Sequence, residues 1–271
     1  MRTLKLKSFG FLCVFSLFLS LSVYADYFDA GLIAYEKGDY KTAMELWTPL
    51  AEQGDAIAQL SIGVMYEKGE GVVKDDDQAV MWFRHAAEQG LAEAQSHLAL
   101  KYRRGEGVIV DYQEAAEWYL LAAEQGLSRA QYNLGYMYEN GLGVTEDDKE
   151  AAKWYQLAAE QGDDSAQYNL GYMYRYGIGV LKNYKEAVKW FKLAAEQGDT
   201  YAKTHLGLMY SQGKGVPQDD VIAYMWLNLA TVEGVEEAAK IKKLLAKEMT
   251  SKQIAGAQKL SKECIKKEYK N

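Results

Sequence analysis

Apolar residues recur along this chain at intervals that fit one face of an α-helix. In the clearest stretch such residues fall at positions i, i+4, i+7 and i+8, which predicts a helix from about Ala130 to Asn140. A second stretch, with the spacing i, i+3, i+4, i+7 and i+8, begins at Ala151 and ends before Gly162. The pattern therefore predicts pairs of helices, with Tyr138 and Trp154 filling the space between them.

The helix pair repeats with a fixed period of 36 residues. Each copy closes with Ala-Glu-Gln-Gly, and the closing glycines are Gly54, Gly90, Gly126, Gly162 and Gly198, with a degenerate sixth copy at Gly234. A Gly-x-Gly-Val loop keeps the same step from Gly69 to Gly213, as does a tryptophan series, Trp82, Trp118, Trp154, Trp190 and Trp226. A fixed period of about 20 to 50 residues is typical of a solenoid, in which each unit packs only on its neighbours.

The loop between the two helices contains the residues that are expected to end one helix and start the next. Gly141 suits a left-handed C-cap for the first helix of its copy. The acidic pair Asp147–Asp148 is favourable at the positive end of the second helix.

The segments before and after the repeats differ from them in composition. Residues 1–25 read as a secretory signal peptide, because a basic start precedes the apolar run from Phe9 to Leu21 and small residues precede a cleavage point between Ala25 and Asp26. Residues 26–54 resemble a tetratricopeptide hairpin that lacks the Gly-x-Gly-Val loop. Residues 55–234 form the repeat array, and residues 235–271 are expected to form two basic capping helices, with Thr250 and Gln253 at capping-box spacing for the second.

The repeat resembles a known family. The sequence Ala-x-x-x-Leu-Gly-x-x-Tyr-x-x-Gly-x-Gly-Val, followed by Asp, Ala, Trp and Ala-Ala-Glu-Gln-Gly, is similar to the Sel-one-like repeat, a relative of the tetratricopeptide repeat. The resemblance runs from about Ala56 to Gly234, with departures at Ala99 and Lys101 in the second full copy. It implies an all-α fold, a right-handed α/α superhelical solenoid of about five such repeats, that binds proteins.

The charge of the chain argues against one class of partner, and its cysteine content limits disulfide formation. Residues 26–234 hold 18 Lys and Arg against 33 Asp and Glu, so this part of the chain is acidic and a nucleic-acid partner is not expected. Residues 235–271 hold 10 Lys and 5 Glu, which fits either a polar cap on the solenoid or a docking surface for an acidic partner or a membrane. Cleavage after Ala25 would remove Cys13 and leave Cys264, either an unpaired thiol or a site of intermolecular pairing.

No motif predicts catalysis. His85, His97 and His205 are not spaced to share a metal, so neither a metal nor any other cofactor is expected. Some cysteine-rich secreted members of the resembled family have been linked to β-lactam binding, and Ser211-Gln212-Gly213-Lys214 formally matches Ser-x-x-Lys. That motif needs both side chains on a stable helix, whereas here it lies where a helix is expected to break, so the chain is predicted not to be an enzyme.

The remaining candidate is a binding surface on the first helices of the repeats, which line the concave face in tetratricopeptide-like superhelices. Tyrosine and arginine are enriched at binding hot spots and occupy the positions opposite the predicted core face. The candidate residues are Arg103, Arg104, Tyr132, Tyr136, Tyr168, Tyr172, Arg175 and Tyr176. The sequence leaves open the alternative that some of these tyrosines pack between adjacent repeats.

We therefore expect an exported, periplasmic or secreted scaffold of a bacterium that presents a concave surface to another protein or peptide. A segment that is acidic or ends in a carboxylate is the expected ligand, because arginine binds carboxylates through two parallel hydrogen bonds. No membrane-spanning segment is expected in the mature chain. Two alternatives stay open: a secreted factor that acts on a host protein, and an enzyme that binds β-lactams or cell-wall fragments.

Overall fold

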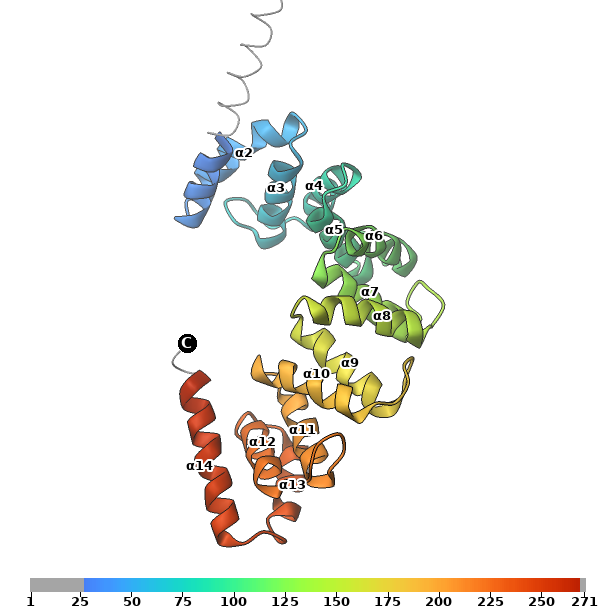
Figure 1. Cartoon of the computed structure of the whole chain (residues 1–271). Helices are drawn as coiled ribbons and strands as arrows, with labels where there is room; N and C mark the ends of the chain where they lie inside the picture. Colours follow the sequence, from blue (N-terminus) through green and yellow to red (C-terminus); the bar gives the residue numbers. More distant parts are fainter. Residues whose placement is uncertain (1–26, 269–271) are drawn as a thin grey trace, which may run out of the picture. The chain divides into compact units, whose positions relative to one another are not determined.

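The computed structural model describes residues 27–268, with side chains as far as Cys264, and every regular element in that range is an α-helix (Figure 1). The expected all-α repeat solenoid is confirmed. The helices form two compact units, the first ending at Gln125 and the second beginning at Gly126. The predicted signal peptide, residues 1–25, lies outside the described residues.

The first unit contains a helical segment over residues 27–36, followed by α2 (Tyr40–Glu52), α3 (Ala56–Lys68), α4 (Asp76–Glu88), α5 (Ala92–Arg104) and α6 (Tyr112–Glu124). The second unit contains α7 (Ser128–Asn140), α8 (Asp148–Glu160), α9 (Asp164–Tyr176), α10 (Tyr184–Glu196), α11 (Thr200–Gln212), α12 (Asp220–Val232), α13 (Glu236–Leu245) and α14 (Ser251–Glu268). Within each unit, consecutive helices from α2 to α13 pack against each other, as expected for stacked helix pairs, whereas α14 packs on α12.

Local residues set the ends of the helices, as the sequence predicts. In the copy that contains α7 and α8, Gly141 ends the first helix with φ +63°, and its N–H donates to the Met137 carbonyl. Asp147 is the N-cap of α8, where its carboxylate accepts from the backbone N–H groups of Lys149 and Glu150. These contacts satisfy backbone groups that a helix end leaves unpaired.

The second glycine of the loop has a different role. Gly179 has φ +63°, and a Cβ at this position would overlap the Asp148 carbonyl in the first turn of α8. The loop of one repeat therefore lies directly on the second helix of the repeat before it. This close approach explains the second glycine of the Gly-x-Gly loop, whereas the first is needed for the left-handed helix cap.

The deepest aromatic side chains differ from those predicted. Trp154 and Trp190 are buried, at 7% and 6% exposure, but Trp82, Trp118 and Trp226 are only partly buried. The residue that follows each tryptophan is fully buried instead, and these residues are Phe83, Tyr119, Tyr155, Phe191 and Leu227. The prediction that the tryptophans form the core is therefore correct for two of them and incomplete for the other three.

A glycine in the first helix makes room for this buried side chain. A Cβ at Gly63 would lie 2.6 Å from the Phe83 ring, and one at Gly171 would lie 2.8 Å from the Phe191 ring. The missing side chain therefore allows each second helix to approach the first closely. In the second full copy, Ala99 takes the place of the glycine and is itself fully buried.

Glutamine pairs join the two helices of each repeat. The Gln125 side-chain amide donates to Gln95 Oε1 at 2.8 Å, and Gln95 donates in turn to the Ala87 carbonyl of the preceding repeat at 3.2 Å. The same pairing occurs at Gln89–Gln59, Gln161–Gln131 and Gln197–Gln167. The glutamine of Ala-Glu-Gln-Gly therefore satisfies a buried amide and helps to tie one repeat to the next.

The first hairpin follows the same plan as the full repeats. Trp47 is 3% exposed, and a Cβ at Gly31 would overlap its indole ring. Trp47 therefore occupies the place that Phe83 holds in the next copy. Its indole N–H donates to the Phe28 carbonyl at 3.1 Å.

Two helices end the described chain, as predicted, and the first of them, α13, stops at Leu245. The expected capping box forms at α14, because Thr250 N–H donates to the Gln253 side chain and Gln253 N–H donates to Thr250 Oγ1. The helix α14 packs alongside α12 (Figure 1), and the Cys264 sulfur lies 3.8 Å from the Met225 sulfur.

Candidate binding surface

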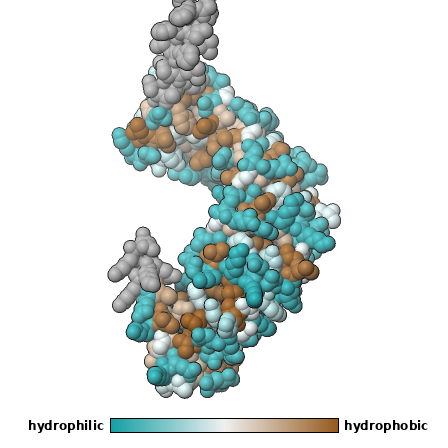
Figure 2. All heavy atoms as spheres, in the orientation of Figure 1, coloured by the Kyte–Doolittle hydropathy of each residue, from teal (hydrophilic) through white to brown (hydrophobic). Residues whose placement is uncertain are grey.

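The structure divides the predicted binding residues between the two units. Arg103 and Arg104 end α5 in the first unit, whereas the six others lie on α7 and α9 in the second. One surface that contains all eight residues therefore stays a prediction. Figure 2 shows that hydrophilic residues cover most of the visible face, with apolar patches between them.

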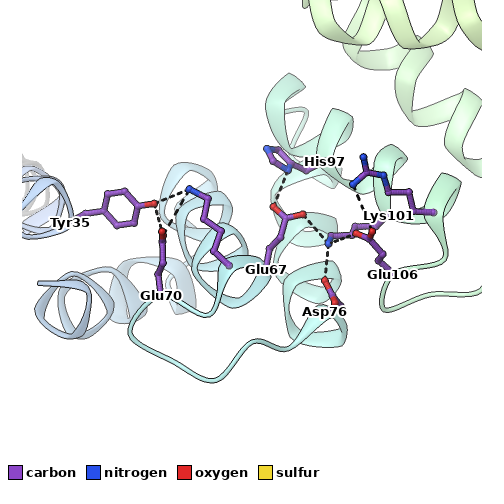
Figure 3. Close-up of polar contacts among 9 residues, drawn as sticks. Tyr35, Glu67, Glu70, Asp76, His97, Lys101 and Glu106 are labelled. Atoms are coloured by element: carbon purple, nitrogen blue, oxygen red, sulfur yellow. Dashed lines mark hydrogen bonds and ion pairs between the residues drawn. The ribbon is translucent and has the colours of Figure 1, made fainter. Parts of the chain in front are cut away.

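In the first unit, an ion cluster occupies the region just before the two arginines. Lys101 is 1% exposed, and its ammonium lies 2.8 Å from Glu67, 2.7 Å from Asp76 and 2.9 Å from Glu106 (Figure 3). Burial acts to lower the pKa of Lys101, but the hydrogen bonds that its ammonium donates to the three carboxylates outweigh it and raise the pKa above its usual value. The departure from the family pattern at this position therefore places a cluster of one ammonium and three carboxylates where other copies have a methionine.

The side chains around this cluster also have partners within the first unit. Arg104 is exposed, with its guanidinium 3.7 Å from Glu106, and Arg103 is half-buried. His97 stacks on Phe83 with its Nδ1 3.7 Å from Glu67. The charges of this region largely compensate one another, so the cluster is a packing feature that links neighbouring helices.

On α7, one predicted tyrosine belongs to the core. Tyr132 is half-buried and its ring lies 5.8 Å from that of the fully buried Tyr155, whose hydroxyl donates to Glu139 at 2.6 Å. Tyr136, one turn along, is 38% exposed. Tyr132 therefore packs against the second helix of its own repeat, whereas the alternative left open by the sequence was packing between adjacent repeats.

On α9 the predicted residues meet two residues of α11. Tyr168, Tyr172, Arg175 and Tyr176 of α9 lie against Tyr201 and His205 of α11, and these six residues are called here the α9–α11 surface. Tyr168 is central, because its ring lies within 6.4 Å of the rings of Tyr172, Tyr201 and His205. Tyr176 and Tyr201 are 44% and 61% exposed, whereas the other four residues are half-buried.

His205 is held on three sides. Its ring stacks on the core residue Phe191 at 4.8 Å, with an angle of 11° between the planes. Its Nδ1 is in contact with the Arg175 guanidinium, and its Nε2 lies 3.4 Å from the Tyr168 hydroxyl. Because a guanidinium can only donate, Nδ1 must accept, so Nε2 carries the proton and donates to Tyr168.

This environment keeps His205 neutral. Burial, together with the nearby charge of Arg175, lowers the pKa of His205 to about 4. Burial also raises the pKa of Tyr168 to about 12. At neutral pH His205 and Tyr168 are therefore neutral, and Arg175 is the cation of the α9–α11 surface.

Tyr201 and His205 were not among the predicted binding residues. His205 was considered only as a metal ligand, and Tyr201 lies outside the helix positions assigned to the surface. The interval of 30 residues from Arg175 to His205 contained a signal, because Glu67 and His97 have the same spacing and also meet. Such a pair joins the end of one first helix to the middle of the next.

The formal Ser-x-x-Lys motif does not have the geometry of a catalytic pair. The helix α11 ends at Gln212, and Gly213 follows in a left-handed conformation with φ +62°. Ser211 donates to the Leu208 carbonyl at 2.9 Å, while the Lys214 ammonium lies over the Tyr184 ring. The two side chains therefore do not share one helical face, as expected.

The described helices contain none that is long and apolar enough to cross a membrane. Within the same residues, no group of three or more His, Cys, Asp or Glu side chains could hold a metal ion.

Comparisons with known proteins assign the family. The Sel1 repeat family model matches six consecutive segments, residues 22–55, 56–91, 92–127, 128–163, 164–199 and 200–231. The first of these is the hairpin that the sequence suggested was tetratricopeptide-like. A search of curated proteins finds no match.

Two solved structures resemble this one over most of its length. A protective antigen present in uropathogenic Escherichia coli strains is 34% identical with a TM-score of 0.80, over 90% of this chain but 54% of the antigen's, so this chain spans about half of that protein. A Sel1 repeat protein from Oxalobacter formigenes is 36% identical with a TM-score of 0.73, over 80% of this chain and 86% of the other. With six matched repeats and these relatives, the chain belongs to the Sel1 repeat family, whose members generally mediate protein–protein interactions.

Proposed function

We propose that this protein is an exported, non-catalytic scaffold that binds a segment of a partner protein on the α9–α11 surface. One observation carries the proposal: the exposed Tyr176 lies next to Arg175, which His205 holds in place, and the exposed Tyr201 packs on Tyr168 of the same surface. Tyrosine offers contact area at a small entropic cost, and arginine offers directed hydrogen bonds. Sel1 repeat proteins are typically non-catalytic scaffolds, which supports the same assignment.

Export is part of the proposal and rests on the sequence. A basic start, an apolar run and small residues before Asp26 together are typical of a cleaved secretory signal. The partner would then be a protein of the periplasm or of the extracellular space.

The test begins with crosslinking in the native cell envelope to identify the partner. Binding of that partner is then measured for the double variant Tyr176→Ala/Tyr201→Ala, because Tyr132 and Tyr168 pack internally and their removal would also alter the fold. We expect at least a tenfold loss of affinity with an unchanged melting temperature. Leu193→Ala, an exposed position on α10, is the matched control and should bind normally.

Two results would contradict the proposal. One is full affinity in the double variant. The other is loss of binding only when lysines of residues 235–271 are changed to glutamate, which would place the site on the basic cap.

A second candidate is a secreted factor that acts on a host protein. It is favoured by the relative from uropathogenic Escherichia coli, which is described as a protective antigen and is similar over 90% of this chain. Detection of the protein in culture supernatant, with a cytoplasmic marker retained in the cells, would support this candidate over a periplasmic scaffold.

A further inference from the structure

The electrostatic setting of Arg175 differs from that of two equivalent residues, Glu67 and Glu139. Among the residues that the structure describes, Arg175 forms no ion pair; its guanidinium contacts His205 and lies 5.1 Å from the centre of the Tyr176 ring. One repeat earlier, the equivalent Glu139 accepts from the Tyr155 hydroxyl. In the first full copy, the equivalent Glu67 is paired with Lys101. In the second full copy the equivalent residue is Arg103, which lies in the first unit. On the α9–α11 surface the cation Arg175 contacts the rings of His205 and Tyr176.

The contacts of Arg175 and Tyr168 also determine which hydrogen-bond donors face a ligand on this surface. A guanidinium has five N–H donors in a rigid plane and no acceptor, and His205 occupies one edge of it. The Tyr168 hydroxyl accepts from His205, so its own O–H is a further donor on the same surface. Asp199, whose charge acts on Tyr168, is engaged at the start of α11, where its carboxylate accepts from the Ala202 N–H at 2.6 Å. A ligand group that fits this arrangement is an acceptor without donors.

We propose that Arg175 binds the side-chain carboxylate of an aspartate or glutamate in the partner segment, while Tyr176 and Tyr201 hold an aromatic or aliphatic side chain next to it. The inference rests on the proposed function and names the chemistry of the ligand. A carboxylate matches the guanidinium through two parallel hydrogen bonds, and the surrounding rings exclude water, which strengthens them. A single guanidinium accommodates a single carboxylate, so one acidic residue beside one apolar residue is the expected recognition element.

His205 is a positioning residue in this arrangement. It stacks on the immobile core ring of Phe191 and accepts from Arg175, so it fixes the plane of the guanidinium before the ligand arrives. Asparagine occupies the equivalent position in the two preceding copies, at Asn133 and Asn169. The substitution His205→Asn therefore keeps a side chain that the repeat tolerates and removes the stacked acceptor.

The test uses the full-length mature protein and short labelled peptides, acetylated and amidated at their ends, in a Gly-Ser background. The peptides carry Glu-Phe, Gln-Phe or Lys-Phe, and affinity is measured by fluorescence anisotropy. We expect the wild-type protein to bind the Glu-Phe peptide at least tenfold more tightly than the Gln-Phe peptide. Arg175→Gln should abolish this preference, and Arg175→Glu should shift it to the Lys-Phe peptide. Arg129→Gln, at an exposed arginine of α7, should retain it.

The variant His205→Asn should reduce the preference for Glu-Phe by about threefold or more, with the affinity for Gln-Phe unchanged, because a misplaced guanidinium loses one of two hydrogen bonds. Circular dichroism and the melting temperature verify that each variant is folded. An additional Gln-Phe peptide with a free terminal carboxylate separates a chain terminus from a side chain as the source of the charge.

Each contrary outcome has a distinct meaning. Equal binding of the Glu-Phe and Gln-Phe peptides, or a preference that survives Arg175→Gln, overturns the inference, as does binding of none of the peptides. Tight binding of only the peptide with the free terminus overturns the assignment to a side chain. If Tyr201→Ala weakens all peptides equally while no acidic preference exists, the surface binds segments of proteins as proposed, and only its carboxylate chemistry is wrong.

Discussion

The Lys203 ammonium lies 2.6 Å from Oε1 of Glu233, at the two positions where the other full repeats pair glutamines. Lys203 is 1% exposed, so its charge lies in the same buried setting as the glutamine amides. The degenerate sixth closing motif, in which glutamate replaces glutamine, is therefore matched by a lysine 30 residues earlier. The two departures from the repeat compensate for each other.

This pairing predicts a specific result for a double-mutant cycle. Glu233→Gln alone should lower the free energy of unfolding by about 3 kcal/mol, because it leaves a buried ammonium without its carboxylate. The double variant Lys203→Gln/Glu233→Gln restores the glutamine pair of the other repeats and should lie within about 1 kcal/mol of the wild type. Urea unfolding followed by circular dichroism measures both values. A double variant as unstable as Glu233→Gln would show that the two positions are not coupled.

The ion cluster of the first unit predicts an effect that depends on pH. Lys101→Met introduces the residue found at this position in other copies, but leaves three carboxylates close together, so we expect a loss of about 3 kcal/mol at pH 7. The exposed neighbour Lys74, changed to methionine, should cost less than about 0.5 kcal/mol.

The pH dependence of this cluster follows from two pKa values. A hydrogen bond from Lys101 lowers the pKa of Asp76. The contribution of this carboxylate to the free energy of unfolding is therefore present above pH 3.8 and is lost as the pH falls further. The raised pKa of Lys101 means that its contribution is lost only as the pH rises above 10.5. In the Lys101→Met variant, mild acid should instead reduce the repulsion between the carboxylates and recover stability. Unfolding free energies that run parallel to those of the wild type between pH 7 and pH 4 would contradict this account.

The core geometry predicts that Phe83 matters more than the tryptophan before it. Phe83→Ala should cost about 3–5 kcal/mol, the usual range for a fully buried large aromatic side chain. Trp82→Ala should cost clearly less, because that side chain is only partly buried. Chemical denaturation of both variants gives the comparison, and an equal or larger loss for Trp82→Ala would reverse the assignment of the core position.

His205 predicts a loss of stability in mild acid. Its pKa is about 4 in the folded protein and near 6.5 in the unfolded chain, so between these values the unfolded chain binds more protons. Stability should therefore fall as the pH drops from 6.5 to 4, by up to about 3 kcal/mol. His205→Asn should show a flatter profile over the same range. Identical slopes for the two proteins would mean that His205 is not buried as a neutral group.

Export predicts a defined mature chain. Cleavage after Ala25 should give a protein that begins at Asp26, because small residues precede this position and an apolar run precedes them. Intact-mass measurement of protein recovered from the cell envelope or the medium decides the point. A mass that retains the first 25 residues would refute the cleavage.

The surface could be predicted from the sequence in part. Helix periodicity placed Tyr168, Tyr172 and Tyr176 on one helix face, and these residues do meet. The same reasoning assigned Tyr132 to the surface, although its ring packs beside Tyr155. Helix positions alone do not distinguish the two cases, because a residue at the border of the apolar face can be covered or left open by the neighbouring helix.

The sequence by itself determined the repeat, its helix pairs and their ends. Gly141 and Asp147 act on backbone groups within a few residues, so their effect is readable locally and recurs with the period. Only the tertiary structure decided which aromatic residue is innermost, that Lys203 pairs with Glu233, and that His205 holds Arg175. Each of these depends on contacts between different helices. Adjacent residues of one helix differ by about 100° around its axis, so which of them is buried depends on what packs against that helix.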